Sequence, residues 1–155
     1  MGLQKKLVDR LSVVRIDNLS HVTLGINLHG SQLHHSSAKQ VWSILAGIID
    51  VTDNEPFVVG CFWGDSKPRD AGSFMKEAVT ELKSLLSEGL YMPGLEENIP
   101  VTLMHIVCDT PARSFFKQVK GHSGYFGCDK CIQHGIRVDH TMTFPDLRAP
   151  LRGDA

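Results

Sequence analysis

The sequence predicts an α/β fold, and three segments carry this prediction. Residues 21–28, HVTLGINL, alternate apolar and polar side chains, which is the pattern of a half-buried strand. Residues 70–88 place apolar side chains at helical spacing and are followed by Gly89, a common helix terminator. Residues 99–108, IPVTLMHIVC, are almost continuously apolar, as in a central strand that is covered on both faces. Strands and helices mixed in this way are typical of α/β proteins.

The remaining elements follow in chain order. Residues 1–18 support only a short helix or an irregular lead-in. Residues 41–49 are ambiguous, because their apolar spacing favours a helix whereas their β-branched content and Gly47 favour a buried strand. Residues 57–63, FVVGCFW, are short and rich in strand formers. Residues 111–120 begin with a proline suited to a first helical turn and offer one apolar and one basic face.

Size and charge limit the class of protein. The chain has 155 residues, a formal net charge of −1 and a pI near 6.7. This length fits a single domain. A nearly neutral chain has no overall basic field, so any nucleic-acid binding must be local.

The absence of targeting signals and the cysteine usage indicate an intracellular protein. No run approaches 18 apolar residues, and the first ten residues lack the apolar stretch of a secretory signal. We therefore expect no membrane partner. Cys61 and Cys108 each lie within an apolar run, and we expect them to be small buried hydrophobes in a reducing compartment.

Asp109 stands directly after the predicted strand at residues 99–108. In open α/β sheets, ligands and metals gather at the carboxyl ends of strands, which favours Asp109 over the other acids as a functional residue. The alternative is that Asp109 only caps the following helix by accepting hydrogen bonds from its first amides. The two roles are compatible.

A cysteine pair follows the glycine-rich segment after Lys120. The spacing of Cys128 and Cys131 allows both sulfurs to face one tetrahedral zinc ion. Two more ligands are needed, and the nearby candidates are His122, His134 and His140. A thioredoxin-like redox pair is a weaker alternative, because that motif opens a helix directly after a strand.

Two other clusters have a functional and a simpler interpretation. The histidines of residues 29–35 suggest a metal site, although a solvated polar turn is the more common explanation. Arg113, Lys117 and Lys120 lie on one face of the predicted helix at residues 111–120, where they could contact DNA phosphates. Three charges on a surface helix more often serve only solvation.

The segment VCDTPARSFFKQVKGHSGYFGCDKC at residues 107–131, with MTFPDLRAPLR at 142–152, resembles a transposase domain of the cut-and-paste, CACTA-like type. The upstream segments INLHGSQLHHSSAKQVWSILAGI and EPFVVGCFWGDSKP resemble the earlier strands of that domain. The similarity spans about residues 20–153, and the stretch from the aspartate to the cysteine pair is its most specific part.

This resemblance implies a partial ribonuclease-H-like core of three antiparallel strands, a helix, a strand and a helix. The core would occupy residues 19–120, after a lead-in at 1–18. A zinc-knuckle-like insertion and an irregular tail would occupy 121–155. On this basis we expect residues 41–49 to form a strand, against the helical spacing.

In this family three carboxylates hold two divalent metal ions, usually magnesium, that act on phosphodiesters. The resemblance makes Asp109 the second of these acids and places His29 where the first should stand. Imidazole is a poor ligand for magnesium. The third acid, and the histidine pair that completes the zinc site, would lie beyond residue 155.

We therefore expect a transposon-derived, catalytically inactive remnant, nuclear by resemblance. The first alternative is a zinc-stabilised module that binds DNA or protein through the 113–120 segment and the cysteine knuckle. The second is a fragment of a longer, active transposase.

Overall fold

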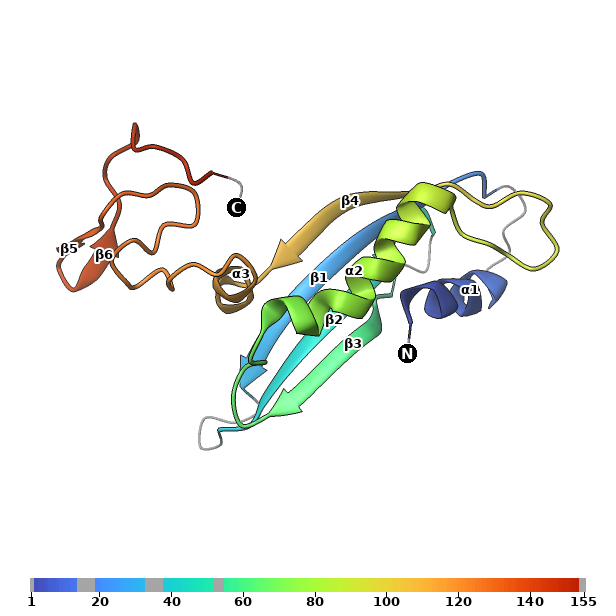
Figure 1. Ribbon diagram of the computed structural model, residues 1–155, viewed down its shortest axis with the longest axis horizontal. Coiled ribbons are helices and arrows are strands. Elements are labelled where there is room, and N and C mark those ends of the chain that lie inside the picture. Colours follow the sequence, from blue (N-terminus) through green and yellow to red (C-terminus); the bar gives the residue numbers. More distant parts are fainter. Residues whose placement is uncertain (1, 14–18, 33–37, 52–54, 154–155) are drawn as a thin grey trace. The chain divides into compact units, whose positions relative to one another are not determined.

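The computed structural model describes residues 2–13, 19–32, 38–51 and 55–153. The chain forms two compact units, Met1–Val107 and Cys108–Ala155, and each is described by itself. Figure 1 labels the elements. The first unit contains α1 (Leu3–Val13), β1 (Val22–Gln32), β2 (Gln40–Ile48), β3 (Phe57–Gly64), α2 (Ala71–Glu88) and β4 (Val101–Cys108), whose last residue begins the second unit. The second unit continues with α3 (Thr110–Phe116), β5 (Ile136–Val138) and β6 (Thr141–Thr143).

One mixed four-stranded sheet organises the first unit, in the order β3-β2-β1-β4. The pairs β1–β2 and β2–β3 are antiparallel, and β4 runs in the same direction as β1 (Figure 1). The described strands do not close into a barrel. The predicted α/β class and the succession of three antiparallel strands, helix, strand and helix are thus confirmed at the level of elements.

Residues 41–48 of the ambiguous 41–49 segment lie in strand β2, so the helical spacing was misleading and the strand implied by the resemblance is correct. Burial alternates along β2, with the inward side chains facing those of β1: Ile44 is opposite Leu28, and Ile48 is opposite Leu24. The outward positions of β2 include Val41 and Leu45, which are also apolar. Burial therefore alternates with the period of two expected for a strand, but the sequence does not show this alternation because both faces carry apolar side chains.

Helix α1 forms from the ambiguous first 18 residues because three leucines share one of its faces. Leu3, Leu7 and Leu11 have exposed fractions of 1%, 0% and 0%, and α1 contacts both α2 and β3. Glu81 of α2 accepts a hydrogen bond from the Gln4 amide at 2.9 Å. Gly2 lies so near this carboxylate that an added Cβ would be 2.7 Å from Glu81 Oε1. Packing, rather than propensity, therefore stabilises α1.

Helix α2 begins and ends where the sequence predicts. Asp70 is its N-cap and accepts a hydrogen bond from the Ser73 amide at 2.6 Å. Hydrogen bonding from Ser73 lowers the pKa of the Asp70 carboxyl. At the other end, Gly89 has φ 79° and donates to the Leu85 carbonyl at 3.0 Å. A Cβ at Gly89 would lie 2.8 Å from the Ile99 carbonyl oxygen, so glycine is required for two reasons.

Strand β4 is an edge strand, and the expectation that both its faces are covered is wrong. Met104, Ile106 and Val107 are 63%, 54% and 50% exposed, and β4 pairs only with β1 among the described strands. An apolar run shows that a strand can be buried but not what buries it. Cys61, on the opposite edge strand β3, is likewise exposed rather than buried, and Cys108 is half-buried.

The second unit corrects two further expectations. Helix α3 ends at Phe116 instead of continuing to residue 120, because Gln118 has φ 52°, a left-handed backbone conformation that a right-handed helix cannot include. The tail at 121–155 is not wholly irregular, since β5 and β6 form a small antiparallel hairpin. Its two turn residues, Asp139 and His140, have φ values of 45° and 65°, the left-handed pair that favours a tight two-residue turn.

Candidate functional site

Asp109 lies at the junction of β4 and α3 and caps that helix. Its Oδ1 accepts a hydrogen bond from the Ala112 amide at 2.7 Å, and its backbone has φ −66° and ψ 167°. The Arg113 amide closes the first turn by donating to the Asp109 carbonyl at 2.8 Å. The capping role is therefore present, and it leaves a half-buried carboxylate at the carboxyl end of a strand.

His29 lies within β1, opposite Ser43, and its side chain is exposed. It belongs to the first unit and Asp109 to the second, so each is considered within its own unit. Strand β1 continues through Gln32, so the turn expected from residue 29 onwards begins later. His34 and His35 lie outside the described residues.

Cys128 and Cys131 are neighbours in the second unit, and we call the segment that contains them the knuckle. Cys131 is buried. The Gln133 side-chain amide donates to Cys131 Sγ at 3.0 Å. This hydrogen bond is the main cause of a lowered pKa for the Cys131 thiol, with smaller contributions from the Cys128 thiol and the positive charge of Arg152. A thiol with a lowered pKa is more readily ionised, and the thiolate is the form that binds metals and reacts.

Arg152 holds the knuckle in shape, although nothing in the sequence singled it out. Its Nε donates to the Cys128 carbonyl at 2.8 Å and its Nη2 to the Phe126 carbonyl at 2.6 Å. Its backbone amide donates to the Lys130 carbonyl at 2.9 Å. The glycine-rich loop and the end of the chain are thus bound together through backbone carbonyls, which any residue type supplies.

Of the candidate histidine ligands, His134 makes ring contacts instead. His134 stacks on Tyr125 with ring centroids 4.5 Å apart and meets Phe126 edge-on at 4.9 Å. His140 lies in the hairpin turn. Within the described ranges, no three histidine, cysteine or acidic side chains come together as a metal site.

The two sulfurs therefore supply half of a tetrahedral zinc site, and the described residues do not complete it. The same holds for magnesium at Asp109, since the described residues bring no second and third acid to that carboxylate. Both metals remain predictions.

Two of the three predicted DNA-contacting residues, Arg113 and Lys117, contact Asp129 of the knuckle. Arg113 pairs with the Asp129 carboxylate at 3.2 Å, and Lys117 Nζ donates to the Asp129 carbonyl at 3.1 Å. Lys120 is exposed beyond the end of α3. These contacts explain why α3 belongs to the same compact unit as the knuckle, whereas the sequence places a boundary at residue 120.

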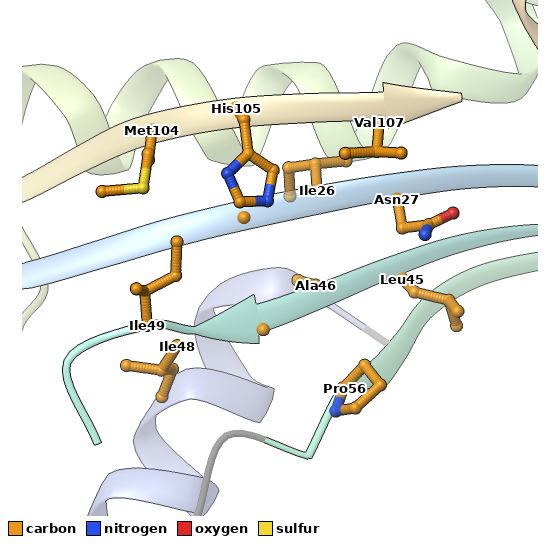
Figure 2. A pocket seen from close by; sticks show the side chains of 12 residues that line it. Ile26, Asn27, Leu45, Ala46, Ile48, Ile49, Pro56, Met104, His105 and Val107 are labelled. Carbon is orange, nitrogen blue, oxygen red and sulfur yellow. The ribbon is translucent and has the colours of Figure 1, made fainter. Parts of the chain in front are cut away.

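A separate hollow of about 400 Å³ lies on the sheet of the first unit. Figure 2 shows the His105 ring projecting from β4 over β1, with Met104 beside it and Leu45 across the hollow. A Cβ at Gly25 would lie 2.7 Å from His105 Nε2, so glycine makes room for the ring. Asn27 and His105 are the polar side chains of an otherwise apolar lining.

Comparisons of the chain with protein-family models, with curated proteins and with solved structures gave no match. In the described part of the chain, no helix has the length and apolar character needed to cross a membrane.

Proposed function

We propose that this chain is a transposon-derived, transposase-like protein whose DNA-cutting core is catalytically inactive. The arrangement of three antiparallel strands, α2, β4 and α3 supports a partial ribonuclease-H-like core, as the resemblance implies. Nuclear residence is part of the same proposal.

The observation that carries the proposal is the position of Asp109. It follows β4 directly, its carboxylate stays half-buried while it caps α3, and the cysteine knuckle follows in the same unit. On β1, His29 offers a nitrogen donor where the family places an oxygen donor. One carboxylate cannot neutralise two divalent cations, and the described residues bring no complete set of ligands for two-metal phosphodiester chemistry to Asp109.

A plasmid-nicking assay with magnesium or manganese tests this proposal. We expect the wild-type protein to nick supercoiled DNA no faster than buffer does, and Asp109→Ala to behave identically. Asp65→Ala, an exposed acid of the first unit, is the matched control. Metal-dependent nicking that Asp109→Ala abolishes and Asp65→Ala retains would overturn the proposal.

A nucleic-acid-binding module is a second candidate, favoured by the charge distribution. Residues 108–155 contain seven lysines and arginines and five acids, a net charge of +2, whereas residues 1–107 contain nine and twelve, a net charge of −3. The overall charge of −1 therefore conceals a basic unit. Such a local excess is what binding to phosphates requires. Zinc at Cys128 and Cys131 remains part of this candidate.

A further inference from the structure

A broad hollow of about 820 Å³ opens on the second unit, between the end of α3 and the knuckle. Its lining combines two aliphatic and one aromatic side chain with several charged ones. The residues that line it are Phe116, Lys117, Gln118, Val119, Asp129, Lys130, Leu151, Arg152 and Gly153. The lysines and arginine of this lining lie far apart in sequence, at positions 117, 130 and 152, so the sequence pattern did not predict that they would cluster.

The hollow is cationic. Lys117, Lys130 and Arg152 contribute three positive charges, and Asp129 is the one acid among the described residues of the lining. The Asp129 carboxylate is already paired with Arg113 at 3.2 Å. The three cations of the lining are therefore not neutralised from within the hollow.

These cations retain donors for a ligand. Lys117 donates one hydrogen bond to the Asp129 carbonyl. An ammonium group has three donors, so two remain for a ligand. Arg152 uses Nε and Nη2 on carbonyls, which fixes the plane of its guanidinium. Lys130 is exposed and forms no ion pair with the described residues. One positioned guanidinium and two ammonium groups suit the dispersed charge of a phosphate.

A backbone hydrogen bond links two exposed aromatic residues to Arg152 of this hollow. The Phe126 carbonyl accepts Arg152 Nη2 at 2.6 Å, which ties the Tyr125–Phe126 segment to the cationic side. Tyr125 and Phe126 are 46% and 45% exposed, and His134 holds both rings by stacking and edge contact. Exposed rings beside a cationic groove are the usual platform for unpaired bases.

We propose that the hollow binds a backbone phosphate of single-stranded nucleic acid, with a neighbouring base stacked on Tyr125 or Phe126. This inference rests on the second candidate function and not on the inactive core. Single strands are favoured over duplexes because paired bases keep their faces within the helix stack, where a surface ring does not reach them.

The charge requirement is tested with the full chain by fluorescence anisotropy of a labelled oligothymidylate of about 12 nucleotides. We expect Lys117→Gln/Lys130→Gln to weaken binding about tenfold at moderate salt. It should also reduce the slope of log K against log salt by about 0.7, because the contact with one phosphate is lost. The matched control is Lys76→Gln/Lys83→Gln, which removes the same charge from exposed positions of α2.

The stacking requirement is tested with Tyr125→Leu, which we expect to weaken binding of the single strand while Tyr125→Phe restores it. Circular dichroism checks that each variant is folded. An equal loss in the α2 control would show non-specific attraction and overturn the site while leaving nucleic-acid binding intact. The site would also be overturned if a duplex bound as tightly as the single strand, or if no binding occurred at all. The same holds if inorganic polyphosphate displaced the oligonucleotide equally well from Tyr125→Leu and from the wild type. Nicking is read out separately, so the inactive-core proposal stands or falls on its own assay.

Discussion

Single residues with local roles were the easiest to predict. Asp70 and Gly89 act within four residues of their own position in sequence, so their roles as helix start and stop follow from residue type and spacing. Arg152 acts across 24 residues on the Cys128 carbonyl, and no local pattern indicates that contact. Asp109 lies between these cases, because its cap is local whereas any metal-binding role depends on groups far away in sequence.

The Asp70 cap makes the stability of the first unit depend on pH. Its pKa is lowered in the folded state, so the unfolded chain binds the proton more readily. The stabilisation from this carboxylate is therefore present above the unfolded pKa of about 3.9 and lost as the pH falls through the folded pKa. We expect Asp70→Ala to lower Tm by a few degrees at pH 7 and by less at pH 3.

Asp70→Asn is the control for this experiment, because asparagine caps as well as aspartate but does not titrate. It should match the wild type at pH 7 and lack the change attributable to residue 70 at low pH. Thermal unfolding followed by circular dichroism measures all three proteins. Equal Tm values for the wild type and Asp70→Ala at pH 7 would show that the cap contributes nothing.

At the scale of elements, predictions from the sequence failed where packing decides between two patterns. In residues 41–49 both strand faces carry apolar side chains, so the helical and extended patterns coincide until the neighbours are known. For α3 the pattern of apolar and basic side chains predicted a helix as far as residue 120, but the left-handed backbone at Gln118 ends the helix. In α1 three leucines have the spacing of one helical face, but the irregular pattern of the adjacent residues obscured this spacing.

Helix α1 should behave as part of the core and not as a detachable lead-in. We expect Leu7→Ala to destabilise the protein by about 2–5 kcal/mol, because Leu7 is fully buried and the cavity left behind adds to the lost burial. Val13→Ala in the same helix should cost little, since Val13 is 87% exposed. Urea unfolding measures both. Equal, small effects would mean that α1 is not packed against α2 and β3.

At the scale of the molecule, the sheet ends in a strand that lacks the usual protection of an edge. Strand β4 contains no charged side chain and no proline over residues 101–108. Natural edge strands generally carry such features because unpaired backbone groups recruit other strands. The apolar character of β4 can be predicted from the sequence. Its position at the edge of the sheet cannot, because that position depends on the order of all four strands.

We expect the protein to self-associate through β4, and Met104→Lys to reduce this association because it places a charge on the exposed edge. Sedimentation velocity over a concentration series measures the effect. Tyr91→Lys is the matched control: it adds the same charge at a 58% exposed position outside the strands and should leave association unchanged. If both variants reduce association equally, net charge rather than the strand edge is responsible.

The contact between Gly2 and Glu81 has a practical consequence for recombinant production. A side chain at position 2 would fit only if the flexible Glu81 carboxylate moved aside. Cloning schemes that replace Gly2 with alanine or serine would push Glu81 away from the Gln4 amide and loosen the first turn of α1. Recombinant versions of this sequence should therefore keep glycine at position 2.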